Sequence, residues 1–232
     1  MELAHDTTGS ARAHTIGKEH LVNIVVYGAS GMIGQRITQE ALNRGHKVTA
    51  IVRSPSRFTL THSNLTIKEG NILDPNDTAR TVAGHDAVIN ATRQSADPPG
   101  QTYADAAHAL IDGLTRAGVR RLIVVGGAGS LEVAPGLQLV DTPNFPAAWR
   151  PGSLALRDAL AVYRTADLDW TYFSPANRIA PGERTGHYRT GTDQLVTDEK
   201  GESRISVEDY AVALIDELET PRFVRQRFTV AY

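Results

Sequence analysis

The sequence predicts an α/β fold built on a doubly wound, mainly parallel sheet. From Leu21 onward, short β-branched segments alternate with segments in which apolar residues recur at helical spacing. This alternation is typical of right-handed βαβ units. The 232 residues are 41% hydrophobic, which is enough for one core. We therefore expect a single domain over residues 21–232, preceded by a mobile extension over residues 1–20, where no periodicity is present.

The first half of the chain supplies five strands and three helices. Apolar β-branched runs predict the strands, and amphipathic spacing predicts the helices between them. Gly45 ends the first helix, which starts at Met32, and Asp74 with Pro75 opens the second. The expected strands are 21–27, 48–52, 65–68, 87–91 and 121–125, and the second and third helices are 74–83 and 103–117.

The second half of the chain carries two segments that we expect on the substrate side. Residues 127–150 are rich in Pro and Gly and predict a loop that is a candidate flap. Residues 177–204 contain two extended pieces, 186–189 and 194–197, and predict a small appended hairpin or lobe. Around these segments we expect helices 153–165 and 207–218, the latter with a capping box at Ser206, and strands 170–173 and 227–230.

Composition excludes several kinds of protein. A net charge of -2 offers no basic surplus for nucleic acid or an anionic membrane, and no apolar run approaches the length of a membrane span. The absence of cysteine removes disulfides and thiolate sites, and no cluster of His or carboxylate residues predicts a metal. The N-terminal residues lack the apolar stretch of a secretory signal. We therefore expect a cytoplasmic monomer or homodimer that acts on a small molecule.

A glycine turn follows the first strand and opens the first helix. Gly28, Gly31 and Gly34 form a Gly-x-x-Gly-x-x-Gly pattern, and this position between a buried strand and a helix is that of the dinucleotide-binding turn of Rossmann-like folds. Bare backbone lets a pyrophosphate come close, and the helix N-terminus offers free N–H donors. The residues expected to bind the cofactor here are Gly28, Ser30, Gly31, Met32 and Ile33.

The residues after the second strand predict NADPH rather than NADH as the cofactor. In NAD-binding folds an acidic residue at this place binds the adenosine ribose, yet no Asp or Glu occurs between Glu40 and Glu69. Arg53 stands there instead, followed by Ser54 and Arg57, and a guanidinium pairs well with a 2′-phosphate. The ends of the third and fourth strands add Asn71, Ile72, Ala91, Thr92 and Arg93 as expected cofactor-binding residues.

Four segments give the chain a family resemblance. The glycine turn, Val125–Ser130, Trp170–Ala176 and Pro181–Gly186 are similar to segments of the atypical short-chain dehydrogenases of the NmrA-like, NAD(P)H-binding group. Within that group the chain most resembles the NADH-flavin reductases and the biliverdin reductase B type of flavin reductase. The resemblance implies that Pro175 borders the nicotinamide, that Gly126 belongs to the cofactor site, and that Ser130 lies near the serine position of the superfamily.

The sequence departs from this superfamily in its catalytic pair. Common short-chain dehydrogenases use Tyr-x-x-x-Lys, in which the lysine helps the tyrosine pass a proton to a carbonyl oxygen. None of the four lysines here has a tyrosine four residues before it. The helix expected to carry the pair has Arg157 and Arg164 as its basic residues, and arginine does not readily act as a tuned proton donor. An ordinary carbonyl or alcohol oxidoreductase is therefore disfavoured.

Three functions fit these observations. The first is an NADPH-dependent reductase of a flavin, quinone or similar conjugated acceptor, because hydride delivery to an electron-poor ring needs positioning more than a dedicated acid. The second is a non-catalytic NADP(H)-binding redox sensor. The third is a biosynthetic reductase, epimerase or dehydratase, in which loop residues carry the acid–base chemistry. The candidate catalytic residues are Ser130, Arg157 and His187.

Overall fold

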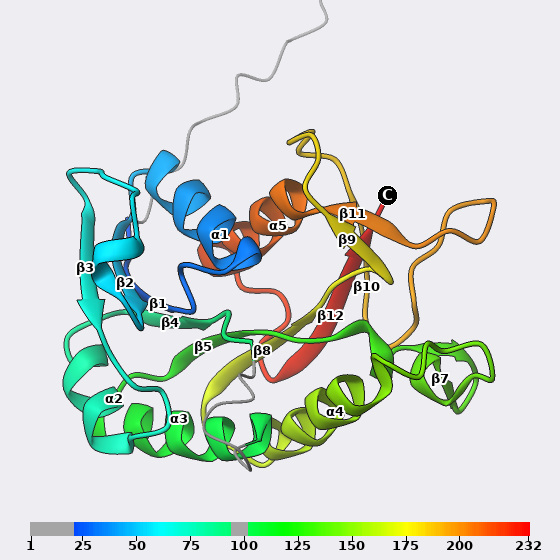
Figure 1. Ribbon diagram of the computed structural model, residues 1–232, viewed down its shortest axis with the longest axis horizontal. Helices are drawn as coiled ribbons and strands as arrows, with labels where there is room; N and C mark the ends of the chain where they lie inside the picture. The colour runs from blue at the N-terminus through cyan, green and yellow to red at the C-terminus, as the bar shows by residue number, and fades with distance from the viewer. Residues whose placement is uncertain (1–20, 94–101) are drawn as a thin grey trace, which may run out of the picture.

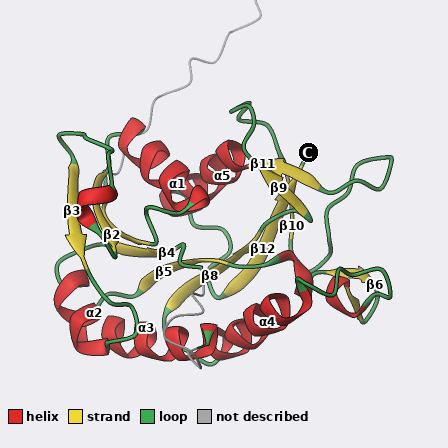
Figure 2. Cartoon of the chain, viewed as in Figure 1, coloured by secondary structure: helices red, strands yellow, loops and turns green. Residues whose placement is uncertain are grey.

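The computed structural model describes residues 21–93 and 102–232, and Figure 1 shows their arrangement. The expected extension over residues 1–20 lies outside the described residues. A mainly parallel sheet forms the middle layer, and helices cover both of its faces (Figures 1 and 2). The doubly wound α/β fold that the sequence predicts is therefore confirmed.

Within the described residues the main sheet has eight strands in the order β10-β12-β8-β5-β4-β1-β2-β3. All neighbouring pairs are parallel except β10 with β12, which run antiparallel at one edge. The order reverses between β1 and β4, and this switch point is where open α/β sheets bind ligands. The strands are β1 (Asn23–Tyr27), β2 (Lys47–Val52), β3 (Leu65–Glu69), β4 (Ala87–Asn90), β5 (Arg121–Val125), β8 (Asp169–Ser174), β10 (Arg189–Gly191) and β12 (Gln226–Ala231).

Five helices pack on this sheet in the described parts of the chain. α1 (Met32–Asn43) and α5 (Val207–Glu219) lie side by side on one face, above the sheet in Figure 1. α2 (Pro75–Val82), α3 (Tyr103–Ala117) and α4 (Arg150–Arg164) cover the other face. Each face has its own apolar core, so a central strand is buried on both sides. This explains why the central strands read as continuous apolar runs rather than alternating ones.

The helix boundaries follow from local polar contacts. The side chain of Asp74 accepts from the Asn76 amide and starts α2, and Thr102 with Asp105 forms a reciprocal capping box at the start of α3. The capping box expected at Ser206 is only half formed. Its hydroxyl accepts from the Asp209 amide at 2.9 Å, but the buried Asp209 carboxylate accepts from other groups, as described below.

Two expectations for the second half of the chain are wrong. The segment 127–150 is not a structureless loop, because it contains the 3-10 turns η2 (Ala128–Ser130) and η3 (Leu139–Asp141) and the strands β6 (Glu132–Ala134) and β7 (Leu137–Gln138), which pair antiparallel. α4 accordingly starts three residues earlier than expected.

Of the hairpin or lobe expected within residues 177–204, the hairpin does not form. β9 (Arg178–Ala180) pairs instead with β11 (Arg204–Ser206), and β10 joins the open edge of β12. An exposed row of backbone groups at a sheet edge offers more pairing than two short isolated pieces can offer each other. None of the helices in the described ranges is both long and apolar enough to cross a membrane.

Candidate functional site

The carboxyl ends of the parallel strands bring the expected cofactor residues to one edge of the sheet. Tyr27 is in register with Ile51 of β2 and with Asn90 of β4. Gly28, Arg53 and Ala91, which come next in the chain, therefore follow neighbouring strand ends. In the same way Val125 is in register with Phe173, which places Gly126 and Pro175 at this edge. The structure thus gathers segments that lie up to about 150 residues apart in the sequence.

The glycine turn is shaped by backbone contacts that leave no room for side chains. Gly28 has φ of +75°, and a Cβ there would lie 2.5 Å from the Ala91 carbonyl oxygen. A Cβ on Gly34 would overlap the carbonyl oxygen of Gly28. The Gly31 amide donates to that same oxygen at 3.0 Å. Gly28 and Gly34 therefore permit the turn itself, because the backbone after β4 occupies the space beside Gly28 and the backbone of the turn occupies the space beside Gly34.

The N-terminus of α1 has the properties of an anion site. Gly31 is the N-cap residue, it makes no side-chain capping bond, and no acidic residue occurs in the first turn. Ser30, Gly31 and Met32 are exposed. The first-turn amides thus keep their hydrogen-bonding capacity for a ligand, and the helix dipole favours a negative one. This geometry fits the pyrophosphate of a dinucleotide, which the residues Gly28, Ser30, Gly31, Met32 and Ile33 would hold.

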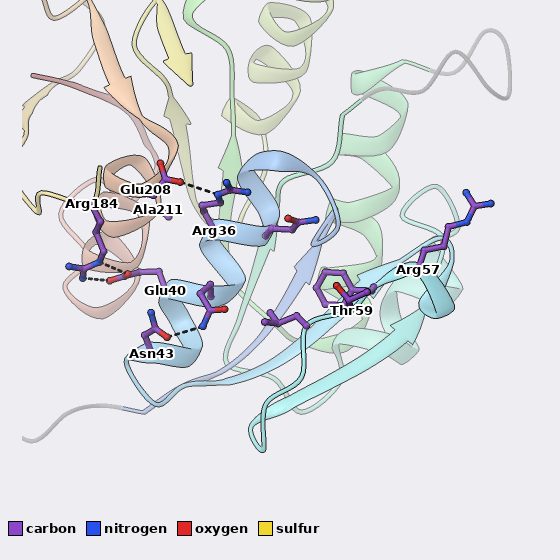
Figure 3. A pocket seen from close by; sticks show the side chains of 12 residues that line it. Arg36, Glu40, Asn43, Arg57, Thr59, Arg184, Glu208 and Ala211 are labelled. Carbon is purple, nitrogen blue, oxygen red and sulfur yellow. Dashed lines mark hydrogen bonds and ion pairs between the residues drawn. The ribbon is translucent and has the colours of Figure 1, made fainter. Parts of the chain in front are cut away.

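The end of β2, where we expect the adenosine part of the cofactor, is basic. Arg53 and Ser54 directly follow β2 and are exposed, and Arg57 ends the short 3-10 turn η1 (Pro55–Arg57). Figure 3 shows the Arg57 side chain directed outward, apart from the side chains of α1. Two of the residues expected to bind the cofactor follow β3 and make local contacts. The Asn71 side chain accepts from the Leu73 amide at 3.1 Å, and Ile72 packs against the apolar core on the α3 side of the sheet.

Sequence reasoning missed Asn90, the last residue of β4. Its side-chain oxygen accepts from the amide of Thr92 at 3.0 Å and from the Thr92 hydroxyl at 2.7 Å. Its amide donates to the Tyr163 hydroxyl at 3.4 Å. The Thr92 oxygen is thereby left as an acceptor beside the glycine turn. A buried polar residue that ends an otherwise apolar strand is the sequence signal that points to it.

Neighbouring side chains occupy the space beside Gly126 and Gly127. A Cβ on Gly126 would lie 2.6 Å from the ring carbon Cζ of Tyr172, and one on Gly127 would lie 2.8 Å from Leu156. The Tyr172 hydroxyl in turn donates to the Leu156 carbonyl at 2.9 Å. These glycines let the β5 end approach β8 and α4, so their spacing has a structural cause in addition to the expected contact with the cofactor.

The three candidate catalytic residues lie in separate places. Ser130 is buried at the end of η2, Arg157 donates to Gln138 of the flap at 3.3 Å, and His187 is exposed on the loop before β10. Within the described ranges no hydrogen bond or ion pair joins any two of the three. They therefore do not form one contacting catalytic set in this structure.

The His187 loop is held against α5 rather than against α4. The Asp209 carboxylate, at the start of α5, accepts from the Gly186 amide at 2.7 Å and from the Thr185 hydroxyl at 2.6 Å. It also accepts from the Tyr232 hydroxyl at 2.7 Å. Burial alone would raise the pKa of Asp209, but these hydrogen bonds outweigh it and lower the pKa. Asp209 thus stays charged and fixes the loop.

The structure also has no tyrosine poised for proton transfer in α4. Burial raises the pKa of Tyr163 to about 12, against a smaller lowering effect of the hydrogen bond from Asn90. The residue four positions later is Asp167 rather than lysine. Tyr163 is therefore a neutral phenol at physiological pH, in agreement with the missing Tyr-x-x-x-Lys pair.

The two segments that we expect on the substrate side contact each other. The Glu132 amide of the flap donates to the Asp193 carbonyl at 2.8 Å, and the Leu195 amide donates back to the Glu132 carbonyl at 2.8 Å. Arg227 of β12 contacts both segments, because it donates to Ser130 and to the Asp193 carboxylate. Flap and lobe are therefore one connected unit beside the ends of β5, β8 and β12.

A cavity of about 540 Å³ lies on the outer side of α1 (Figure 3). Four of its charged side chains are already paired, Arg36 with Glu208 at 3.1 Å and Arg184 with Glu40 at 2.8 Å. It runs along α1 between the residues after η1 and α5, away from the ends of β4, β5 and β8. Among the described residues, no group of three or more His, Asp and Glu side chains could hold a metal ion.

Comparison with known proteins decides the family. The family described as NAD(P)H-binding matches residues 28–218, from the glycine turn to the end of α5. The chain belongs to this family. The match confirms the resemblance to the NAD(P)H-binding group of atypical short-chain dehydrogenases, and it covers every segment that carried that resemblance.

Three solved structures are similar to the chain over about nine-tenths of its length. A "putative exported protein" from Burkholderia pseudomallei is 49% identical, with a TM-score of 0.83 over 91% of this chain and 100% of that one. A "putative epimerase" from Bacteroides thetaiotaomicron is 42% identical, with a TM-score of 0.86 over 91% and 97%. A "putative NADH-flavin reductase" from Streptococcus pneumoniae TIGR4 is 35% identical, with a TM-score of 0.80 over 90% and 99%.

Proposed function

We propose that this protein is an NADPH-dependent reductase that transfers hydride to a flavin, a quinone or a similar conjugated acceptor. The observation that carries the proposal is the cradle at the end of β1. There the uncapped N-terminus of α1 and the exposed Arg53 and Ser54 lie at adjacent strand ends. Such a cradle matches a dinucleotide whose ribose bears a phosphate. Bound NADPH would supply the hydride, and the residues of this chain bind and orient.

The charge at the end of β2 supports NADPH over NADH. Arg53 and Ser54 offer guanidinium and hydroxyl donors to a 2′-phosphate, and no acidic side chain follows β2 that would accept from a ribose hydroxyl. Thr92, fixed by Asn90, offers an acceptor beside the turn. On the substrate side the proposal assigns Gly126 and Pro175 to the nicotinamide, and the connected flap and lobe to the acceptor.

The acceptor class follows from what the site lacks among the described residues. No Tyr and Lys pair is present to protonate an isolated carbonyl, and Tyr163 stays neutral and buried. A conjugated ring spreads the incoming charge, so solvent supplies its proton without a dedicated acid. The similar structure from Streptococcus pneumoniae, with its name as a "putative NADH-flavin reductase", supports a flavin as one such acceptor.

The test is a calorimetric titration of the full chain with NADPH and with NADH. We expect tighter binding of NADPH, and a loss of that preference in Arg53→Ala by about 1.5–3 kcal/mol, the usual value of hydrogen bonds to charged groups. Arg116→Ala is the matched control, because this arginine is exposed on α3 and pairs with Asp112 far along the chain from the turn. Equal binding of both cofactors by the wild type would refute the NADPH assignment.

Turnover then separates the candidate functions. NADPH oxidation with FMN or 1,4-naphthoquinone is expected from a reductase, whereas cofactor binding without turnover identifies a redox sensor. A biosynthetic epimerase or dehydratase is the second candidate, and the similar "putative epimerase" of 42% identity favours it. It predicts isomerisation or dehydration without net NADPH consumption.

The proposed setting is the cytoplasm, as a monomer or homodimer with a small-molecule substrate. Cell fractionation of the full-length protein tests the location directly. This test matters because a similar protein from Burkholderia pseudomallei is named as exported. Recovery of the protein outside the cytoplasmic fraction would overturn the assignment.

A further inference from the structure

Arg227 is a buried arginine with an unusual set of partners. Its side chain is 5% exposed. It donates to the Ser130 hydroxyl at 3.0 Å and to the Ser130 carbonyl at 2.9 Å, and its Nε donates to the Asp193 carboxylate at 2.9 Å. The three residues come from the last strand, the root of the flap and the lobe. A buried guanidinium is costly to desolvate, so its retention in the middle of these contacts calls for an explanation.

The contact with Arg227 fixes what the Ser130 hydroxyl can do. A serine hydroxyl has two acceptor sites and a single proton to donate. Arg227 has no acceptor, so it occupies a lone pair of Ser130 and leaves the proton for another partner. Among the residues that the structure describes, no group accepts that proton. The adjacent positive charge also strengthens the hydroxyl as a donor.

A second buried hydroxyl lies on the same face of the sheet. Ser174, the last residue of β8, is fully buried, and its Oγ has no partner in the described part of the chain. Thr229 is in register with Ser174, and Arg227 with Tyr172 two residues earlier, so all four side chains share one face. Ser174 directly precedes Pro175, at the strand end assigned to the nicotinamide. Two buried hydroxyls with unused protons match a ligand that brings oxygen acceptors.

We propose that Arg227 is a positioning residue that directs the Ser130 proton toward a carbonyl oxygen of the acceptor. This inference rests on the proposed reductase function and narrows its substrate to conjugated carbonyl compounds such as quinones and the isoalloxazine ring of flavins. In the reaction the acceptor takes one hydride from the reduced nicotinamide and one proton from solvent. Ser130 keeps its own proton and stabilises the negative charge that develops on the carbonyl oxygen, as an oxyanion donor does.

The Asp193 contact couples Arg227 to the arrangement of the flap and the lobe. Asp193 holds the guanidinium from the lobe side, and its backbone carbonyl accepts from the flap residue Glu132 at 2.8 Å. The orientation of Ser130 is therefore set by the closed arrangement of flap and lobe. This arrangement supplies, by a different route, a polarised hydroxyl that the superfamily obtains from its tyrosine and lysine.

The test is a double-mutant cycle on Ser130→Ala and Arg227→Lys, with kcat and KM measured for 1,4-naphthoquinone at saturating NADPH. We expect each single change to lower kcat by about 10- to 100-fold. This loss does not exceed the loss of about 100- to 1000-fold that follows removal of one oxyanion-hole donor. The double variant is expected to lose no more than Ser130→Ala alone, because Arg227 acts through that hydroxyl. NADPH affinity should stay within about twofold of the wild type.

The controls separate the possible failures. Arg225→Lys, on the same segment but paired with Asp167 at 2.8 Å, should leave kcat unchanged, and thermal unfolding confirms that each variant is folded. Full kcat in Ser130→Ala, or losses that multiply in the double variant, would overturn the role of Arg227 while leaving the reductase function intact. Absence of turnover in the wild type would overturn both.

Discussion

Two glycines of the same turn are expected to respond to substitution in different ways. Gly34 lies within α1, and a Cβ there would overlap the Gly28 carbonyl oxygen and lie 2.8 Å from its carbon. Gly31 has φ of −75°, which alanine adopts freely, and its Cβ would meet only the Gly28 oxygen, at 3.3 Å. The clash at Gly34 is with backbone, so no side-chain rotation relieves it. Gly34→Ala should therefore damage folding, and Gly31→Ala should damage only binding.

The magnitudes follow from these contacts. Relief of the Gly34 clash requires α1 to move from β1 by roughly 1 Å, and overpacking of this kind costs about 1–3 kcal/mol. For a domain of this size that lowers Tm by about 2–12 °C. At Gly31 alanine is a poorer N-cap, but it also restricts the unfolded chain, so the change in stability should stay within about 0.5 kcal/mol. Its methyl group would project where the pyrophosphate approaches, and NADPH affinity should fall at least about tenfold, or 1.4 kcal/mol.

Thermal unfolding and NADPH calorimetry on both variants decide the matter. Gly31→Ala should unfold like the wild type and bind NADPH weakly. Gly34→Ala should unfold at a clearly lower temperature even without cofactor. If Gly31→Ala binds NADPH as tightly as the wild type, the uncapped N-terminus of α1 is not the pyrophosphate site. A normal Tm for Gly34→Ala would refute the argument from backbone contact.

Two further predictions concern stability. Burial would raise the pKa of Glu40, but bonds from Arg184 and Arg44 lower it below 4.5, so its stabilising effect is present above that pH and fades as pH falls through the depressed value. Glu40→Gln should cost about 1.5–3 kcal/mol, the usual value of hydrogen bonds to a charged group, because Arg44 keeps Asp216 and Glu219 as partners and Arg184 is half exposed. Urea unfolding at pH 7 and pH 3 should show a smaller cost at pH 3, and an equal cost at both would contradict the charge assignment. Gly126→Ala should lower Tm, because its methyl would press on the Tyr172 ring, and unchanged melting by circular dichroism would show that the ring has room to move.

Local sequence determined most of the fold. The β-branched runs and amphipathic spacings predicted the main strands and helices, and the third helix and fifth strand have the bounds that the sequence indicated. These elements are set by burial of an apolar stripe and by caps within a few residues, such as Thr102 with Asp105. The glycine turn was also visible in the sequence, because a strand, three glycines and a helix follow one another directly.

Only the tertiary structure decided the contacts of the segments that we propose to face the substrate. β10 adds to β12 rather than forming a hairpin, Asn90 fixes Thr92, and Arg227 joins Ser130 to Asp193. In each case at least one of the two residues lies at a free sheet edge or at the end of a strand, where several distant segments could supply a partner. The sequence shows a polar residue at such a place, but its partner depends on which distant segment the completed sheet brings within hydrogen-bonding distance.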